Sequence, residues 1–334
     1  MLALAHYLIG RHNRFYLFER SIMEFLSQYG LFLLKTLTIV IALLVIFAGF
    51  FSMSRKPRPK LEVTSLNEHY EHLHSLMNKE ILGKKSPKKK KNKDNKKPTL
   101  YVIDFHGDIK ASQVEQLREE VTAILCTAKS EDEVLVRLDS PGGIVNSYGL
   151  AASQLQRIRD KNIPLTVSID KIAASGGYLM ACVANHIIAA PFAIIGSIGV
   201  VAQIPNFHRW LKNHNIDVEL LTAGEYKRTL TILGENTEKG RKKFQEDLEK
   251  IHAAFRNYVA SNRAELDIDK IATGEHWLAK DAFDLKLVDT LSTSDDYLVQ
   301  KMSEYKVFKL AIPPKTSLAN KLLKPALRFM HPWG

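Results

Sequence analysis

The serine at position 175 lies where a buried strand is predicted to give way to a helix of small residues. The segment 168–178 reads SIDKIAASGGY, with the strand ending near Asp170 and the helix starting directly after Ser175. Negative charge on an oxygen is favoured at a helix N-terminus, and the N–H of the following Gly176 can donate to a tetrahedral intermediate. Ala173 stands where the G-x-S-x-G nucleophile elbow has its first glycine, although the mechanical arrangement is similar. Ser175 is therefore a candidate nucleophile, and an ordinary N-cap serine is the alternative.

Two further segments carry groups that could act beside such a nucleophile. The first, 138–143, reads LDSPGG, so a strand runs into a turn whose backbone N–H groups can face a ligand oxygen. A strand, a turn and a helix in this order build oxyanion holes and phosphate cradles, although Pro-Gly-Gly alone is an ordinary turn. The second, 223–228, reads AGEYKR and places Lys227 after the expected strand 218–224. A lysine in such a turn is either a solvated surface residue or, in its uncharged form, a general base.

The sequence around these segments alternates between strand and helix. Apolar runs at 101–105, 134–138 and 164–170 predict buried strands. Between them, the spacing of apolar residues predicts helices over 111–128 and 147–161. Strand, helix and strand in repetition indicate right-handed crossovers and a largely parallel sheet, so the predicted fold class is α/β.

An uncharged run at 187–201 could suggest a helix that crosses a membrane. Pro191, Gly196 and Gly199 interrupt this run, and both residue types break helices. We therefore interpret it as short buried strands and a turn.

One long apolar segment near the N-terminus predicts a membrane anchor. Residues 36–53 contain no charge, and the preceding LFLL together with Lys35 extends them to the length that spans a bilayer. A cleaved signal peptide is disfavoured, because the run is longer than the usual apolar region and no A-x-A pattern closes it. We predict one transmembrane helix over 31–53 after an N-terminal segment 1–30. Within that segment, residues 1–22 are interpreted as a mis-called start or a dispensable tail.

The positive charge of the chain is unevenly distributed. The 334 residues carry a net charge of +11, and 46% hydrophobic with 25% charged residues excludes a wholly disordered chain and a multi-span membrane protein. Nine lysines fall within 84–97, and the tail 306–334 is basic, so the body over 98–305 is acidic. Nucleic-acid binding is disfavoured, because it requires a basic stripe on the fold itself. Cys126 and Cys182 are too few for a disulfide framework or a zinc site.

Between the anchor and the body, residues 54–97 are predicted to form a polar stalk and a lysine-rich linker. A polar helix is expected over 61–82, and its histidines lie among glutamates, which is a weak pattern for a metal site. The lysine run is either a flexible spacer or a contact for anionic lipid. The predicted organisation then has one folded domain over 98–305 and a basic C-terminal tail over 306–334.

The three segments together resemble one family of enzymes. LDSPGG, AASGGY, GSIGV at 196–200 and AGEYKRT are similar, in order and spacing, to the membrane-bound signal peptide peptidase (SppA, protease IV) serine protease family, and in particular to its single-domain SohB-type members. The resemblance runs from about residue 23 to residue 289 and includes the anchor. It implies a Clp protease/crotonase-like α/β fold, in which β-β-α turns stack in a spiral.

The resemblance also implies a role for individual residues. Ser175 would be the nucleophile of a serine–lysine dyad, Lys227 its general base, and Ser197 would orient the lysine. The N–H groups of Gly143 and Gly176 would form the oxyanion hole. No cofactor and no metal would be needed.

The activity implied is that of a membrane-anchored serine endopeptidase working through an acyl-enzyme. Its substrates would be peptides or polypeptides, with membrane-derived signal-peptide fragments as candidates. A homo-oligomer is implied as well, because related short forms complete the dyad between neighbouring subunits. Two rival hypotheses remain, a crotonase-like acyl-CoA enzyme and a catalytically inert membrane scaffold.

The expected location is the bacterial inner (plasma) membrane, with a single span. Arg55, Lys56, Arg58 and Lys60 follow that span, and the positive-inside rule then places the folded domain in the cytoplasm. The better-known members of the resembled family face the periplasm instead. We favour the cytoplasmic side.

Overall fold

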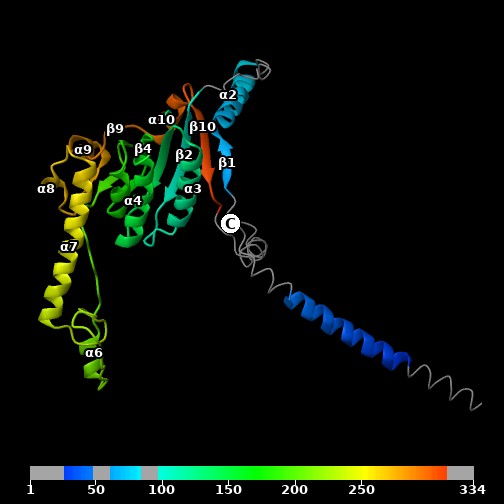
Figure 1. Ribbon diagram of the computed structural model, residues 1–334, viewed down its shortest axis with the longest axis vertical. Helices are drawn as coiled ribbons and strands as arrows, with labels where there is room; N and C mark the ends of the chain where they lie inside the picture. The colour runs from blue at the N-terminus through cyan, green and yellow to red at the C-terminus, as the bar shows by residue number, and fades with distance from the viewer. Residues whose placement is uncertain (1–25, 48–60, 84–96, 314–334) are drawn as a thin grey trace, which may run out of the picture. The chain divides into compact units, whose positions relative to one another are not determined.

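The computed structural model describes residues 26–47, 61–83 and 97–313 of the chain (Figure 1). The chain divides into two compact units, Met1–Pro59 and Lys60–Gly334.

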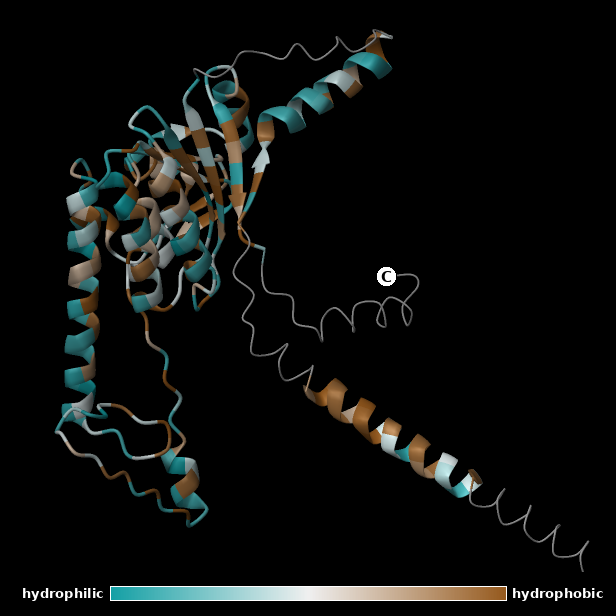
Figure 2. Cartoon of the chain, turned by 45° about the vertical axis from the view of Figure 1, so that its right-hand side comes forward, coloured by the Kyte–Doolittle hydropathy of each residue, from teal (hydrophilic) through white to brown (hydrophobic). Residues whose placement is uncertain are grey.

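The first unit contributes one helix, Leu26–Phe47, which is long and apolar enough to cross a membrane by length and composition. Its mean hydropathy is 2.6, and none of it is buried against protein; Figure 2 shows apolar residues along most of its length. The hydroxyls of Thr36 and Thr38 donate to the carbonyl oxygens of Phe32 and Leu34, so both are satisfied inside the helix. The last six residues of the predicted span 31–53 lie outside the described residues.

The second unit is built on a sheet of seven strands in the order β1-β10-β2-β3-β4-β6-β9. All neighbours are parallel except β1 and β10. The three predicted strands are confirmed as β2, β3 and β4, because runs of apolar residues are typical of parallel strands covered on both faces. The strand bounds are β1 Glu62–Ser65, β2 Thr99–His106, β3 Glu133–Asp139, β4 Leu165–Ile169, β6 His186–Ala189, β9 Thr290–Leu291 and β10 Lys306–Ala311.

A smaller sheet lies beside the large one, and the chain alternates between the two. It contains β5 (Ile172–Ala174), β7 (Ile194–Gly196) and β8 (His276–Leu278). Ser140 extends this sheet through a parallel bridge to Ala173.

The alternation repeats as a β-β-α unit. β3, the Ser140 bridge and helix α4 (Val145–Arg159) form one turn, β4, β5 and α5 (Gly176–Ala181) form the next, and β6 with β7 begins a third. The predicted stack of β-β-α turns is confirmed, and the uncharged run 187–201 contains β6 and β7, as interpreted.

The two faces of the large sheet differ in what covers them. Ile103 and Phe105 of β2 face the main core, where α4 and helix α3 (Val114–Thr127) pack. The alternate residues Leu100 and Val102 face a smaller cluster beneath helix α10 (Ser294–Lys301). Side chains alternate along a strand, so the polar residues that follow on β2 to β4 lie on the α10 face.

Two segments differ from the sequence-based expectation. Lys306–Ala311, assigned to the basic tail, is strand β10, and it pairs with β2 on one side and with β1 on the other. The expected strand 218–224 is irregular, because it finds no strand to pair with in the described residues and Leu220 and Leu221 are 50% and 90% exposed. The predicted polar helix 61–82 is present as α2 (Leu66–Leu82), capped by Ser65 and preceded by β1.

The chain from residue 199 to residue 237 forms an arm that leaves the sheets. It carries the short helix α6 (His208–Asn213) and ends at the long helix α7 (Glu238–Asn262). Figure 1 shows α6 beside the N-terminal end of α7, away from the sheet. Val259, near the opposite end of α7, is the buried residue of that helix. The remaining helices are α8 (Ile268–Ile271) and α9 (Ala279–Asp284).

Glu120 is a buried carboxyl on α3, and it makes the stability of the fold sensitive to pH. The side chain is 6% exposed and accepts the N–H of Ile312. Burial raises the pKa of Glu120 from 4.5 to about 7, with a smaller contribution from the Asp104 carboxylate. Between about pH 4.5 and 7, the Glu120 carboxyl therefore stays protonated in the folded protein, whereas in the unfolded chain it loses its proton.

We expect the free energy of unfolding to fall as the pH rises through this window, by up to about 3 kcal/mol. Glu120→Gln should remove that fall and leave the protein more stable at pH 8. Denaturant unfolding at pH 5 and pH 8 measures the effect, with the exposed neighbour substitution Glu119→Gln as the matched control. Equal pH dependence in the two variants would show that Glu120 does not hold the proton.

Candidate active site

Ser175 sits at the junction of β5 and α5 in a conformation that L-residues rarely adopt. Its φ of 52° and ψ of −120° lie outside the helical and extended regions. Its N–H donates to Gly196 O at 2.8 Å, and its carbonyl accepts the N–H of Leu179. Ser175 occupies the N-cap position of α5, but its side chain makes no capping hydrogen bond to that helix. A strained serine at a strand-to-helix turn is the arrangement that exposes a nucleophilic hydroxyl.

The Pro141–Gly143 turn packs directly against Ser175. A Cβ at Gly142 would come within 2.8 Å of Ser175 Cβ and 2.7 Å of Gly176 N, so this position admits glycine alone. The φ of Gly142 is +88°. A Cβ at Gly143 would meet Ile109 O at 2.1 Å. In the part of the chain that the structure describes, no acceptor takes the N–H of Gly143 or of Gly176.

A chain of hydrogen bonds through the side chains of Ser140 and Tyr148 holds this turn. Neither side chain was predicted from the sequence to belong to the site. Gly142 N–H donates to Ser140 Oγ at 3.1 Å, and Ser140 Oγ lies 2.7 Å from Tyr148 OH. Tyr148 OH donates to Asp108 O at 2.8 Å, so it accepts the proton of Ser140. Both side chains are fully buried, and burial raises the pKa of Tyr148, which keeps its hydroxyl a donor.

Tyr148 also contacts α5, the helix that follows Ser175. A Cβ at Gly176 would approach Tyr148 Cγ to 2.4 Å, so the ring lies directly against the first residue of α5. Tyr148 therefore joins the turn and the start of the helix through one side chain.

A backbone hydrogen bond brings the segment that contains Ser197 beside Ser175. Ser197 follows Gly196, whose carbonyl accepts the N–H of Ser175, and its own N–H donates to Glu275 O at 2.6 Å. Its φ of +54° is again in the left-handed region.

Lys227 is the one predicted site residue that this chain does not bring to the others. It is exposed in a turn of the arm, where its N–H donates to Gly224 O at 3.2 Å. Its side chain makes no hydrogen bond or ion pair with any described residue, Ser175 and Ser197 included. The neighbouring Glu225 is paired with Lys239.

Cys182 is excluded as a competing nucleophile. It is fully buried at the end of α5, and burial raises the pKa of its thiol to about 12. A thiol held protonated in this way is unreactive. The structure confirms its interpretation as a small core residue.

Comparison with known proteins identifies the relatives of this chain. The models of peptidase family S49 and of the peptidase family S49 N-terminal region match residues 157–308 and 24–155. The chain is 50% identical over 329 residues to a probable protease SohB of Haemophilus influenzae, covering 91% of this chain and 93% of that protein. It is 49% identical over 308 residues to a probable protease SohB of Buchnera aphidicola, covering 84% of this chain and all of that protein.

The similarity extends more weakly to other proteases. Protease 4 of Salmonella typhi is 31% identical over 195 residues, covering 57% of this chain and 30% of that protein. Among solved structures, a 1510-N membrane-bound stomatin-specific protease in complex with a substrate peptide aligns with a TM-score of 0.43 and 17% identity. That alignment covers 69% of this chain and 98% of the other.

Proposed function

Because the chain belongs to peptidase family S49, we propose that it is a membrane-anchored serine endopeptidase that cleaves peptide bonds through an acyl-enzyme on Ser175. The observation that carries this proposal is the backbone of Ser175, strained at the start of α5 and packed against the Gly142–Gly143 turn. The N–H groups of Gly143 and Gly176 have no acceptor among the described residues, which supports their proposed assignment as the oxyanion hole.

In the proposed reaction, Ser175 Oγ attacks the carbonyl carbon of the scissile bond while Lys227 Nζ takes the hydroxyl proton. The electron pair displaced onto the carbonyl oxygen is stabilised by the N–H groups of Gly143 and Gly176. The intermediate collapses, the C–N bond breaks, and Lys227 returns the proton to the leaving amine. Water then attacks the acyl-enzyme with Lys227 again as base, and Ser175 regains its proton.

The lysine of this dyad is proposed to come from a second copy of the chain. Lys227 lies on the arm, apart from Ser175 of its own chain, and the arm exposes large apolar side chains that suit burial in an assembly. Val201 and Leu221 are each 90% exposed, and Trp210 is 58% exposed. In the proposed homo-oligomer, Ser197 would orient the ammonium or amine of Lys227 from the second copy. Ser197 directly follows Gly196, whose carbonyl accepts the N–H of Ser175.

The proposed substrates are extended peptides or polypeptides, including signal-peptide fragments released in the membrane. The Leu26–Phe47 helix supports a single-pass anchor in the bacterial inner membrane. The basic residues at 55–60 that follow it favour the cytoplasmic side for the folded domain.

The full chain in detergent should cleave an unfolded polypeptide such as labelled casein, and a chelator should leave the rate unchanged. Mass spectrometry of the fragments would locate the cut bonds. Release of CoA from acyl-CoA without any peptide cleavage would favour the crotonase-like alternative. Absence of both activities, together with an unreactive Ser175, would favour the inert scaffold.

Tyr148→Phe should lower kcat by roughly 10- to 100-fold with KM little changed, because a small displacement of the oxyanion turn misplaces the donors in the transition state. The ring is retained, while Ser140 loses the acceptor that orders its hydroxyl. Steady-state kinetics on a fluorogenic peptide measures the effect.

The matched control for that variant is Tyr178→Phe. Tyr178 is also fully buried, and its hydroxyl donates to Leu287 O at 3.0 Å rather than to the turn. The two variants should lose similar stability, each on the order of 1–3 kcal/mol. An equal loss of kcat in both would contradict a positioning role for Tyr148.

A further inference from the structure

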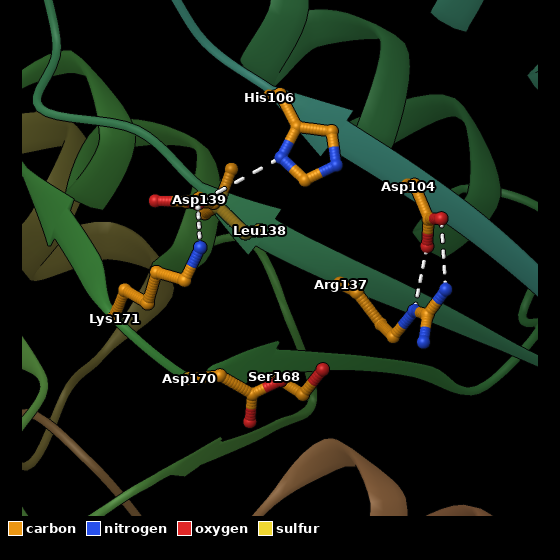
Figure 3. Close-up of a pocket in the computed structure, with 8 residues that line it drawn as sticks. All are labelled: Asp104, His106, Arg137, Leu138, Asp139, Ser168, Asp170 and Lys171. Carbon is orange, nitrogen blue, oxygen red and sulfur yellow. Dashed lines mark hydrogen bonds and ion pairs between the residues drawn. The ribbon is translucent and has the colours of Figure 1, made fainter. Parts of the chain in front are cut away.

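A pocket outside the candidate active site opens on the α10 face of the large sheet. It lies at the C-terminal ends of β2, β3 and β4 and has a volume of about 210 Å³ (Figure 3). The side-chain alternation that places Leu100 and Val102 on this face also places Asp104, Arg137 and Ser168 there.

Each carboxylate that lines the pocket already has partners. Asp104 accepts two hydrogen bonds from Arg137, at 2.6 and 2.8 Å, and also pairs with Lys309. Asp170 accepts the backbone N–H and the hydroxyl of Ser294.

The third carboxylate, Asp139, lies 3.4 Å from Lys171 Nζ and 3.7 Å from His106 Nδ1. Three cations, Arg137, Lys171 and Lys309, therefore balance the three carboxylates.

Two groups that can donate hydrogen bonds remain unused in the pocket. Ser168 is 1% exposed, and its hydroxyl has no partner among the described residues. Arg137 binds Asp104 through Nε and Nη2, which leaves Nη1 for another acceptor. Figure 3 shows this nitrogen pointing away from Asp104, on the side where Ser168 lies. A buried hydroxyl without a partner is costly, so an acceptor in the pocket would relieve it.

We propose that this pocket binds a small oxyanion, a carboxylate or phosphate group, between Arg137, Ser168 and Lys171. The guanidinium and the ammonium supply charge-assisted hydrogen bonds, and Ser168 supplies the buried donor. Oxygen acceptors match the unused donors, whereas an ammonium ligand would find its carboxylate partners already engaged.

The bound anion would also lie beside Asp139 and Lys171, the residues that lead into the two segments of the candidate active site. Asp139 directly precedes the Ser140–Gly143 turn, and Lys171 directly precedes β5, which ends at Ala174 beside Ser175. Two backbone hydrogen bonds join these segments. Ser140 N–H donates to Ile172 O at 2.8 Å, and Ala174 N–H donates to Ser140 O at 3.0 Å.

Titration calorimetry on the full chain in detergent tests the site, with inorganic phosphate, acetate and ammonium as separate ligands. Saturable binding of phosphate or acetate is expected, and the tighter of the two identifies the class of oxyanion. Ser168→Ala removes a hydroxyl that has no protein partner, so the variant should fold, and Lys171→Ala alters a side chain that is 78% exposed. Each should weaken binding by roughly tenfold.

Ser153→Ala, which alters an exposed serine of α4, is the matched control and should bind as the unmodified chain does. Binding is measured without turnover, so the outcome does not depend on the proposed peptidase activity. Absence of saturable anion binding, tighter binding of ammonium, or equal affinity in Ser168→Ala, Lys171→Ala and Ser153→Ala would overturn the proposal.

Discussion

Ser175→Ala is expected to abolish peptide hydrolysis, with a loss of roughly 10⁴-fold or more in kcat, because the proposed acyl-enzyme forms on the hydroxyl that this substitution removes. The substitution removes one hydroxyl that makes no hydrogen bond to α5, so the fold should be unchanged. Cleavage of a fluorogenic peptide and the thermal unfolding midpoint together measure the two effects.

Ser153→Ala serves as the matched serine control in this experiment also. Its hydroxyl bonds only to the carbonyl of Gly149 within α4, so activity should be retained. Residual activity in Ser175→Ala above a tenth of the unmodified rate would remove Ser175 as the nucleophile.

Lys227→Ala is expected to cause a loss of similar size, since nucleophile and base act as a unit and their losses are not additive. Lys212→Ala, which alters another exposed lysine on the same arm, is the matched control and should keep its activity. The measurement is the same peptide assay on each purified variant.

Mixing the two inactive proteins then separates a shared site from a site within one chain. If Ser175 of one copy meets Lys227 of another, mixed oligomers of Ser175→Ala and Lys227→Ala contain some complete dyads and regain part of the activity. Failure of subunit-exchanged mixtures to regain activity would place both residues of each dyad in one chain.

The elements that the sequence predicts well are those whose residues carry their own pattern. β2, β3 and β4 are apolar runs, and α3 and α4 repeat their apolar residues at helical spacing, so local sequence is sufficient. Strand β10 was not predicted, because Lys306 and Lys309 lie three positions apart and place a charge on each face of the strand, and its strand character depends on pairing with β2.

The candidate site divides in the same way. Ser175 and the Gly142–Gly143 turn can be identified from sequence, because small residues follow a predicted strand at both places. The sequence gives no sign that Tyr148, one of the residues of helix α4, belongs to the site. Only the fold brings its hydroxyl to Ser140 and its ring to Gly176. Lys227 is recognised from its motif, but the structure shows no bond between its side chain and any described residue, so its role in the site stays a prediction.

The proposed mechanism requires Ser175 to be the residue that becomes acylated, and a covalent probe measures this directly. The full chain in detergent is treated with a fluorophosphonate, digested, and the modified residue is located by mass spectrometry. One adduct is expected, on Ser175; it should be absent in Ser175→Ala and should form much more slowly in Lys227→Ala. An adduct on another serine, or labelling that persists in Ser175→Ala, would contradict the proposed mechanism.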